Sequence, residues 1–192
     1  MERLILSRHA ESGANTVRRV NGSLGETVRL TATGREQARA LGVALADEPI
    51  GVCATSEFPR TIETADLALE GRDVPRLVLP DLNEIGFGAF EGLSLAEYRE
   101  WANAHGSAEV GPGGTESRAS AAARFARVFR ELLAREEATV LVVTHALAIR
   151  YLLSGPSPYV EPVPLAEPHV YARAEAALLL EQLEAWLRSP TW

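Results

Sequence analysis

The sequence contains no lysine, so its 19 basic residues are all arginines, and 26 aspartates and glutamates outnumber them. The resulting formal net charge of −7 disfavours general nucleic-acid binding, and we expect no nucleic-acid partner. The one cysteine, Cys53, cannot form an internal disulfide, and its apolar neighbours predict a buried thiol. No apolar stretch reaches the roughly 18 residues of a membrane span, and the N-terminus lacks a secretion signal. We therefore expect a cytoplasmic protein with no membrane partner.

A length of 192 residues, 46% hydrophobic and 23% charged, is typical of one globular domain. Short apolar segments alternate with segments of helical periodicity, which predicts an α/β fold. We expect residues 1–192 to form a single domain, a three-layer α/β/α sandwich with a mostly parallel central sheet. The predicted strands are about residues 4–7, 52–55, 75–80, 139–144 and 169–171, and the predicted helices about residues 34–45, 59–69, 95–104, 117–135, 146–153 and 174–188.

Two regions depart from this alternation. Residues from about 81 to 117 are richer in glycine and aromatic side chains, and they predict a small lobe inserted over the sheet. Several prolines between residues 155 and 168 argue against regular structure there. The C-terminal part, about residues 155–192, is therefore expected to be a linker followed by a helix. The apolar face of that helix, residues 174–187, is a candidate contact for a homodimer.

Two histidines directly follow predicted strands: His9 after residues 4–7 and His145 after residues 139–144. Ligands of open parallel sheets bind beyond the carboxyl ends of the strands, where both side chains would lie. One histidine after a strand is more often structural than functional, but two at equivalent positions favour a functional site. We interpret the remaining histidines, His105 and His169, as structural or solvated.

Arginines accompany these histidines. Arg8 precedes His9, and Arg60 follows the second strand, so two guanidinium groups would join the two imidazoles. Guanidinium groups match phosphoryl oxygens bidentately, which favours a phosphate ester as ligand, and Asn15 adds a neutral donor. Glu84, after the third strand, can protonate a leaving alkoxide if burial raises its pKa. The plainer alternatives are a surface ion pair for Arg60 and a solvated carboxylate for Glu84.

These residues lie in motifs that resemble those of the histidine phosphatase superfamily, also called the phosphoglycerate mutase-like family. The segment Arg8-His9-Ala10-Glu11-Ser12-Gly13-Ala14-Asn15 resembles its Arg-His-Gly-Glu-Thr-x-x-Asn signature. Further blocks follow in the family's order, at residues 30–38, 55–65, 82–92, 112–117 and 142–145. The resemblance runs from residue 4 to about residue 153, and the ordered set of motifs is more specific than any one of them.

The resemblance implies a role for each of these side chains. His9 is the nucleophile that accepts the phosphoryl group and becomes a phosphohistidine. Glu84 is the proton donor, and His145 completes the catalytic set. The side chains expected to bind the phosphoryl oxygens are Arg8, Arg60, Asn15 and His145. No cofactor and no metal ion are expected, because the arginines and the second histidine carry out the role that a metal ion has elsewhere.

Two alanines depart from the family pattern. The family has glycine after each of its two histidines, where this chain has Ala10 and Ala146. Glycine lets the backbone approach a phosphate closely, so each added methyl group is expected to narrow the pocket without abolishing activity.

The compact chain favours hydrolysis of a small phosphorylated metabolite, because the mutases of the family carry extra segments. The weak candidates for substrate specificity are Arg18, Arg19, Asn21 and Phe87. The two arginines could recognise an additional acidic group on the substrate, with solvated loop arginines as an equal alternative. Phe87 either lines the mouth of the site or packs within the lobe.

Three other functions remain open from the sequence. The chain could transfer a phosphoryl group as a phosphoglycerate mutase does. His9, His145 and Glu84 could instead hold a metal ion as a site of two histidines and one carboxylate, although the neighbouring arginines would repel the cation. The third is a non-catalytic protein that binds a phosphorylated ligand, with the two alanines as signs of lost activity.

Overall fold

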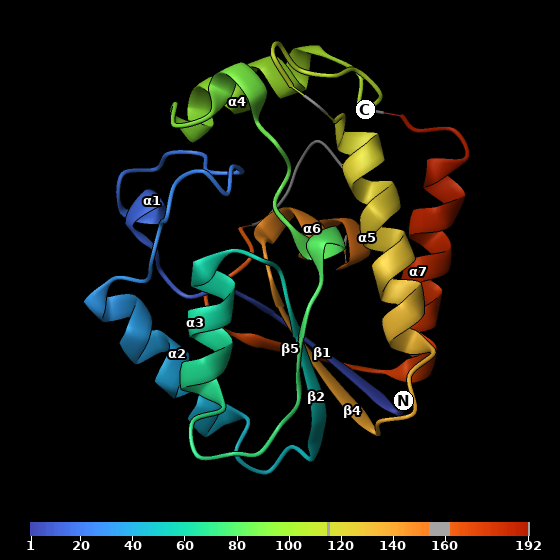
Figure 1. The fold of residues 1–192 in the computed structure, drawn as a ribbon. Coiled ribbons are helices and arrows are strands. Elements are labelled where there is room, and N and C mark those ends of the chain that lie inside the picture. Colours follow the sequence, from blue (N-terminus) through green and yellow to red (C-terminus); the bar gives the residue numbers. More distant parts are fainter. Residues whose placement is uncertain (115, 154–161, 192) are drawn as a thin grey trace.

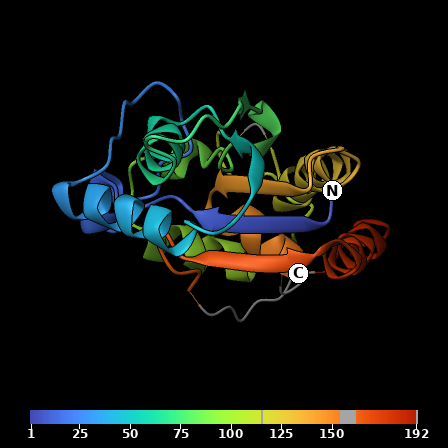
Figure 2. The same ribbon diagram turned by 90° about the horizontal axis from the view of Figure 1, so that it is seen from below.

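The structure, a computed structural model, describes residues 1–114, 116–153 and 162–191. Within these residues a five-stranded sheet has the order β3-β2-β4-β1-β5. The strands are β1 (Arg3–Arg8), β2 (Ile50–Thr55), β3 (Arg76–Val78), β4 (Thr139–Thr144) and β5 (Pro168–Ala172). The first four run parallel, and β5 pairs antiparallel with β1. The predicted mostly parallel sheet is confirmed, and Figure 2 shows β1 between β4 and β5.

Helices cover both faces of the sheet (Figure 1). The helices on one face are α2 (Ala32–Ala44) and α3 (Pro59–Ala68), and those on the other are α5 (Arg118–Leu133), α6 (Ala146–Leu153) and α7 (Arg173–Leu187). Successive strand residues point to opposite faces. Leu4 and Leu6 therefore join the core on the α5 side, while Ile5 joins the core on the α2 side. This is the predicted three-layer α/β/α sandwich.

The two cores differ in the size of their side chains. The α5 side contains Phe125 and Phe129, both fully buried, whereas the α2 side is built from aliphatic residues such as Leu41. Cys53 lies in this second core, and burial raises the pKa of its thiol to about 12. A thiol with this pKa is not a nucleophile near neutral pH, so the prediction of a core cysteine is confirmed.

The beginning of α2 is set by a contact with the loop after β1. Both Thr31 and Thr33 suit an N-cap by sequence, but the structure uses Thr31, whose hydroxyl accepts a hydrogen bond from Gly34 N at 2.9 Å. A Cβ atom at Gly34 would lie 2.0 Å from the carbonyl oxygen of Glu11. The glycine therefore lets α2 pack closely on the segment that follows the first histidine.

Helix α4 (Leu95–Ala104) lies beyond the carboxyl ends of the strands, at the top of Figure 1. It belongs to residues 81–117, which also contain most of the turn η1 (Pro80–Leu82) and all of η2 (Gly88–Phe90). The backbone of this region pairs with the loop after α1 (Gly13–Thr16): Leu95 N donates to Arg18 O at 2.9 Å. The loop and α4 therefore share one rim above the sheet.

The first part of the predicted linker, residues 155–161, lies outside the described residues. From residue 162 the chain leads into β5, which begins one residue before the predicted strand. In the parts of the chain that the structure describes, no helix combines the length and apolar character needed to cross a membrane.

Candidate functional site

The two histidines that follow strands lie side by side. Arg8 and Thr144 are register partners in the parallel pair β1–β4, so the next residue on each strand is a histidine at the same sheet edge. His9 N donates to Thr144 O at 2.9 Å, and the imidazole centroids of His9 and His145 are 5.4 Å apart. Arg60, near the start of α3, reaches both rings, and all three side chains are buried. The topology therefore brings together residues that are 136 positions apart in the chain.

A backbone contact determines the tautomer of His9. Its Nδ1 atom lies 2.7 Å from the carbonyl oxygen of Ala10. A carbonyl oxygen can only accept a hydrogen bond, so Nδ1 carries the proton. The Nε2 lone pair is then free to accept, and Arg60 Nε donates to it at 3.2 Å. His9 consequently presents an unprotonated Nε2 to the site.

Three hydroxyl contacts determine the tautomer of His145. Thr61 Oγ1 donates its one proton to the carbonyl of Phe58 at 2.8 Å. Thr61 then accepts in its 2.7 Å contact with Ser56 Oγ. The contact of Arg60 Nη2 with His145 Nδ1 requires the same direction, because a guanidinium group can only donate and Nε2 must therefore carry the proton of His145. With its own proton used there, Ser56 Oγ accepts from His145 Nε2 at 2.9 Å. The Nδ1 lone pair of His145 is left facing Arg60 Nη2 at 3.3 Å.

Burial and positive charge keep both histidines neutral. Burial lowers the pKa of His9 well below its ordinary value of 6.5, and the charges of Arg60 and Arg8 lower it further. Burial and Arg60 have the same effect on the pKa of His145. Because both lone pairs face one guanidinium group, a metal ion bound between the rings would meet a positive charge, which disfavours the metal-site hypothesis.

Arg60 is held in place by the loop that follows α1. Its Nη1 donates to Asn21 Oδ1 at 2.6 Å, and its Nη2 donates to Asn21 O at 2.9 Å. The Glu91 carboxylate in turn accepts from the backbone of Gly22 at 2.9 Å. A Cβ atom at Gly22 would lie 1.9 Å from the carbonyl oxygen of Ile85, so only glycine permits this close packing. Asn21, predicted as a weak specificity residue, thus makes a positioning contact with Arg60.

Glu84 lies in the wall of the same cavity. Burial raises the pKa of its carboxyl group above the ordinary value of 4.5, against the opposing charges of Arg60 and Arg8 and a hydrogen bond from Ile85 N. A raised pKa keeps a carboxyl group protonated toward neutral pH, as a general acid requires.

The segment that carries Glu84 is clamped by Arg124 of α5. The guanidinium group donates to the backbone carbonyls of Asn83 at 2.6 Å and Glu84 at 3.1 Å. It also forms an ion pair with Glu116 at 2.8 Å, and both of these side chains are largely buried. Because lysine cannot reproduce this fork, the clamp depends on the planar guanidinium group.

We predict that Arg124→Lys lowers kcat/KM for an alkyl phosphate by about tenfold to a hundredfold, because Glu84 loses its fixed position. Arg127→Lys is the matched control, since Arg127, on the same helix, is exposed and, among the residues that the structure describes, pairs with the half-buried carboxylate of Asp81 alone. The measurement is steady-state kinetics with alkyl and p-nitrophenyl phosphates. If Arg124 acts by positioning Glu84, the loss of kcat/KM is larger for the alkyl ester than for the aryl ester. Equal losses for the two esters would contradict this role, and so would equal effects of Arg124→Lys and Arg127→Lys.

The cavity has a volume of about 470 Å³. Of the residues predicted from the sequence, those in its lining are Arg8, His9, Asn15, Arg18, Arg19, Asn21, Arg60, Glu84 and Phe87. His145 lies behind Arg60 and is fully buried. The side-chain carbonyl of Asn15 accepts from Ser12 N at 2.9 Å, which leaves its amide group as the remaining donor.

The two alanines that depart from the family pattern have different surroundings. Ala146 lies in the cavity lining, where its methyl group takes up space. Ala10 is not among the lining residues; it belongs to the core on the α2 side, and its N donates to Thr64 Oγ1 at 3.0 Å. The expected narrowing therefore concerns Ala146.

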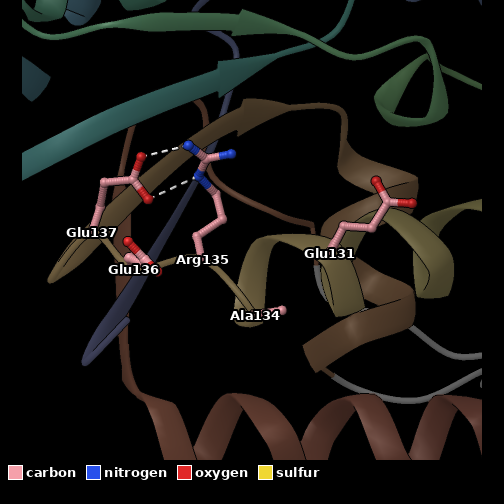
Figure 3. Close-up of a pocket in the computed structure, with 5 residues that line it drawn as sticks. All are labelled: Glu131, Ala134, Arg135, Glu136 and Glu137. Carbon is pink, nitrogen blue, oxygen red and sulfur yellow. Dashed lines mark hydrogen bonds and ion pairs between the residues drawn. The ribbon is translucent and has the colours of Figure 1, made fainter.

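A larger and more open hollow of about 710 Å³ lies before the amino end of β4, at the opposite edge of the sheet from the histidines. Figure 3 shows its lining, in which Arg135 faces Glu137 and forms an ion pair with it. Arg135 thus neutralises one of the carboxylates of this hollow, and the lining contains neither a histidine nor a hydroxyl group. The smaller cavity, which contains His9, Arg60 and Glu84, is therefore the candidate functional site.

Sequence reasoning missed several residues of the site. Arg99 and Arg150 line the cavity, and Ser56, Glu91 and Arg124 support its side chains. The sequence did contain a signal that these two arginines face the cavity, namely their spacing from other lining residues on the same helices. Leu95 and Arg99 are four residues apart on α4, as are Ala146 and Arg150 on α6, so each pair shares a helix face.

Comparison with known proteins gives a consistent result. The profile of the histidine phosphatase superfamily (branch 1) matches residues 4–159. An adenosylcobalamin/alpha-ribazole phosphatase of Salmonella typhimurium is 43% identical over 89 residues, 46% of this chain and 43% of that protein, so the match spans less than half of the relative. A 2,3-bisphosphoglycerate-dependent phosphoglycerate mutase of Gloeobacter violaceus is 36% identical over 80% of this chain and 74% of the relative. The crystal structure of an alpha-ribazole phosphatase from Shigella flexneri has a TM-score of 0.74 with 28% identity, covering 88% of this chain and 89% of that one.

Proposed function

Because the chain belongs to the histidine phosphatase superfamily, we propose that it hydrolyses phosphomonoesters of small metabolites through a phosphohistidine on His9, without a metal ion. The observation that carries the proposal is the convergence of two neutral imidazoles on one guanidinium group, in a cavity that also contains Glu84. Relatives named as phosphatases, such as an acid phosphatase of Mycobacterium tuberculosis that is 40% identical over 103 residues, agree with this reaction class.

In the first step His9 Nε2 attacks phosphorus. The N–P bond forms while the bond to the ester oxygen breaks, and the proton of Glu84 passes to that oxygen, so the alcohol leaves neutral. The hydrogen bond that Nδ1–H donates to Ala10 O orients the ring and stabilises the positive charge that it gains. Arg8 and Arg60 stabilise the charge on the transferring phosphoryl oxygens.

In the second step water attacks the phosphohistidine. Glu84, now ionised, takes a proton from the water, the N–P bond breaks, and inorganic phosphate leaves a neutral His9. His145 assists both steps as a donor to the phosphoryl group. A bound dianion favours the charged form of a neighbouring histidine. His145 Nδ1, which accepts from Arg60 in the free protein, then takes up a proton from solvent and, once Arg60 binds the phosphoryl oxygens instead, donates that proton in a hydrogen bond to the phosphoryl group.

The test is the pH dependence of alkyl phosphate hydrolysis with a chelator present, because an alkoxide leaving group needs the proton of Glu84. His9 must be unprotonated, and its lowered pKa keeps it so until well below pH 6.5. Glu84 must be protonated, and its raised pKa keeps it so above pH 4.5. We therefore expect a bell-shaped pH profile of kcat/KM, in which His9 titrates on the acid limb and Glu84 on the alkaline limb. The profile must first be corrected for the second ionisation of the substrate, at about pH 6.

Two results would overturn the proposal. One is activity that disappears with chelator and returns with a divalent metal ion, which would revive the metal site. The other is a profile that stays flat from about pH 4 to about pH 9, which would remove both titrating groups from the mechanism. Tight binding of inorganic phosphate without turnover of any ester would favour the non-catalytic alternative.

The similarity to a phosphoglycerate mutase over 80% of the chain supports phosphoryl transfer as a second candidate. Both reactions pass through the same phosphohistidine and differ in whether water or a second hydroxyl group accepts the phosphoryl group. The discriminating measurement is inorganic phosphate released per phosphoglycerate consumed. One phosphate per ester indicates hydrolysis, and isomerisation without phosphate release indicates a mutase.

A further inference from the structure

The cavity lining carries more positive charge than a single phosphoryl group requires. It contains six arginines, Arg8, Arg18, Arg19, Arg60, Arg99 and Arg150, and one carboxyl group, that of Glu84. Two of these arginines, Arg8 and Arg60, flank the histidines. The other four form no salt bridge within the described residues, although the chain has a net charge of −7. Such a concentration of one sign in a cavity attracts anions.

Unpartnered polar atoms lie in the same wall. Arg150 Nε and Tyr98 Oη are buried and have no hydrogen-bond partner among the described residues. Both residues line the cavity, and buried polar groups without a partner are rare in folded proteins. Arg99 and Arg150 line the same cavity, and burial together with the charge of Arg99 lowers the pKa of Arg150, which is the effect of repulsion between like charges. A negatively charged ligand group would satisfy the donors and remove this repulsion.

Two elements hold these side chains on one side of the cavity. Leu95, Tyr98 and Arg99 share a face of α4, and Arg150 shares a face of α6 with Ala146. Arg18 is joined to α4 by the hydrogen bond that its carbonyl accepts from Leu95 N. Its φ of 52° is in the left-handed region, which costs free energy for a residue other than glycine. The backbone thus maintains an unfavourable conformation at a cavity-lining arginine.

We propose that Arg150 and Arg99, with Arg18 and Tyr98, form a second anion subsite on the leaving-group side of the cavity, so that the preferred substrate is a phosphomonoester carrying a carboxylate or a second phosphate. This subsite rests on the proposed function and adds the substrate class. Leu95, Leu147 and Phe87 in the same lining suit a short carbon chain between the two anionic groups. The subsite extends the sequence-based suggestion for Arg18 to two arginines that the sequence did not single out.

Three esters with the same three-carbon chain test the subsite. Propyl phosphate has no second anion, 3-(phosphonooxy)propanoate adds a carboxylate, and propane-1,3-diyl bisphosphate adds a phosphate. We expect kcat/KM to be about tenfold or more higher for at least one of the two doubly anionic esters, and their ratio tells which group is preferred. Arg150→Gln should remove most of this advantage, and it should lower kcat/KM for the preferred doubly anionic ester by a clearly larger factor than for propyl phosphate.

Further variants separate the subsite from a general effect of charge. Arg99→Gln should lower the same advantage by a smaller factor, because Arg99 is exposed. Arg39→Gln is the matched control, since Arg39 is an exposed arginine on α2 with its own partner, Glu70. Equal kcat/KM for the three esters in the wild type, or equal effects of the Arg150 and Arg39 variants, would overturn the subsite.

Binding of stable analogues distinguishes failure of the subsite from failure of the proposed function. Butylphosphonate and 4-phosphonobutanoate replace the ester oxygen with carbon, and calorimetry measures their affinities without turnover. Tighter binding of 4-phosphonobutanoate by the wild type, lost in Arg150→Gln, supports the subsite even if no ester is hydrolysed. Equal affinities, together with equally rapid hydrolysis of all three esters, would leave the phosphatase intact and refute the subsite.

Discussion

Replacing His9 with alanine is expected to lower kcat for p-nitrophenyl phosphate by at least about 10⁴-fold, because the reaction loses its nucleophile. The fold should survive the change. The ring lies at the edge of the sheet, beside Arg60 and His145, and its removal leaves Arg60 Nε without one partner. A lost hydrogen bond in this setting corresponds to a decrease in Tm of up to about 8 °C. Steady-state kinetics and a thermal melt measure the two effects.

The matched control is His169→Ala, which removes a half-buried imidazole on β5 outside the cavity. It should retain wild-type kcat. Rapid quenching of the wild type with labelled substrate adds a direct observation, since a phosphohistidine is labile in acid and stable in alkali. If His9→Ala keeps more than about a tenth of the wild-type kcat, or if the label resists acid, His9 is not the nucleophile.

Glu84→Gln is expected to give the second-largest loss, about 10²- to 10⁴-fold in kcat/KM for an alkyl phosphate. Glutamine fills the same space and can accept the hydrogen bond from Ile85 N, but it has no proton to transfer. The loss should be much smaller for p-nitrophenyl phosphate, because nitrophenolate leaves readily without protonation. The rate should therefore depend more steeply on the leaving-group pKa in the variant than in the wild type.

The alkaline limb of the pH profile gives an independent check on Glu84. It should disappear in Glu84→Gln, since that limb reports ionisation of this carboxyl group. Glu70→Gln, which removes an exposed carboxylate on the α2–α3 side, is the control and should change neither quantity. An equal loss for alkyl and aryl esters would show that Glu84 binds or positions the substrate rather than protonating the leaving group.

The sheet and the edge that holds the candidate site could be predicted from local patterns. Strand segments such as Thr139–Thr144 are apolar and β-branched, so they predict buried strands without knowledge of their partners. The carboxyl ends of parallel strands meet at one edge of the sheet, so a histidine directly after each of two such strands must lie at that edge. The predicted positions of His9, Arg60 and Glu84 therefore needed only the order of elements and the direction of the strands, whereas their expected roles came from the family motifs.

The local sequence was less informative where two signals competed. Thr31 and Thr33 have equal N-cap character, and the choice between them depends on how closely Gly34 approaches Glu11 across the fold. The same holds for Asn21, whose sequence neighbours suggest a substrate contact. Its actual partner, Arg60, lies 39 residues away and is brought to it by α3.

By itself, the sequence determined the α/β class, the buried cysteine and the residue types needed for phosphoryl chemistry, because these depend on composition and short-range periodicity. Only the tertiary structure decided the tautomers of the two histidines and the meeting of Arg99 with Arg150 at one wall of the cavity. Those features depend on contacts between elements far apart in the chain, and the free energy of such contacts comes from packing and hydrogen-bond geometry that no short segment encodes.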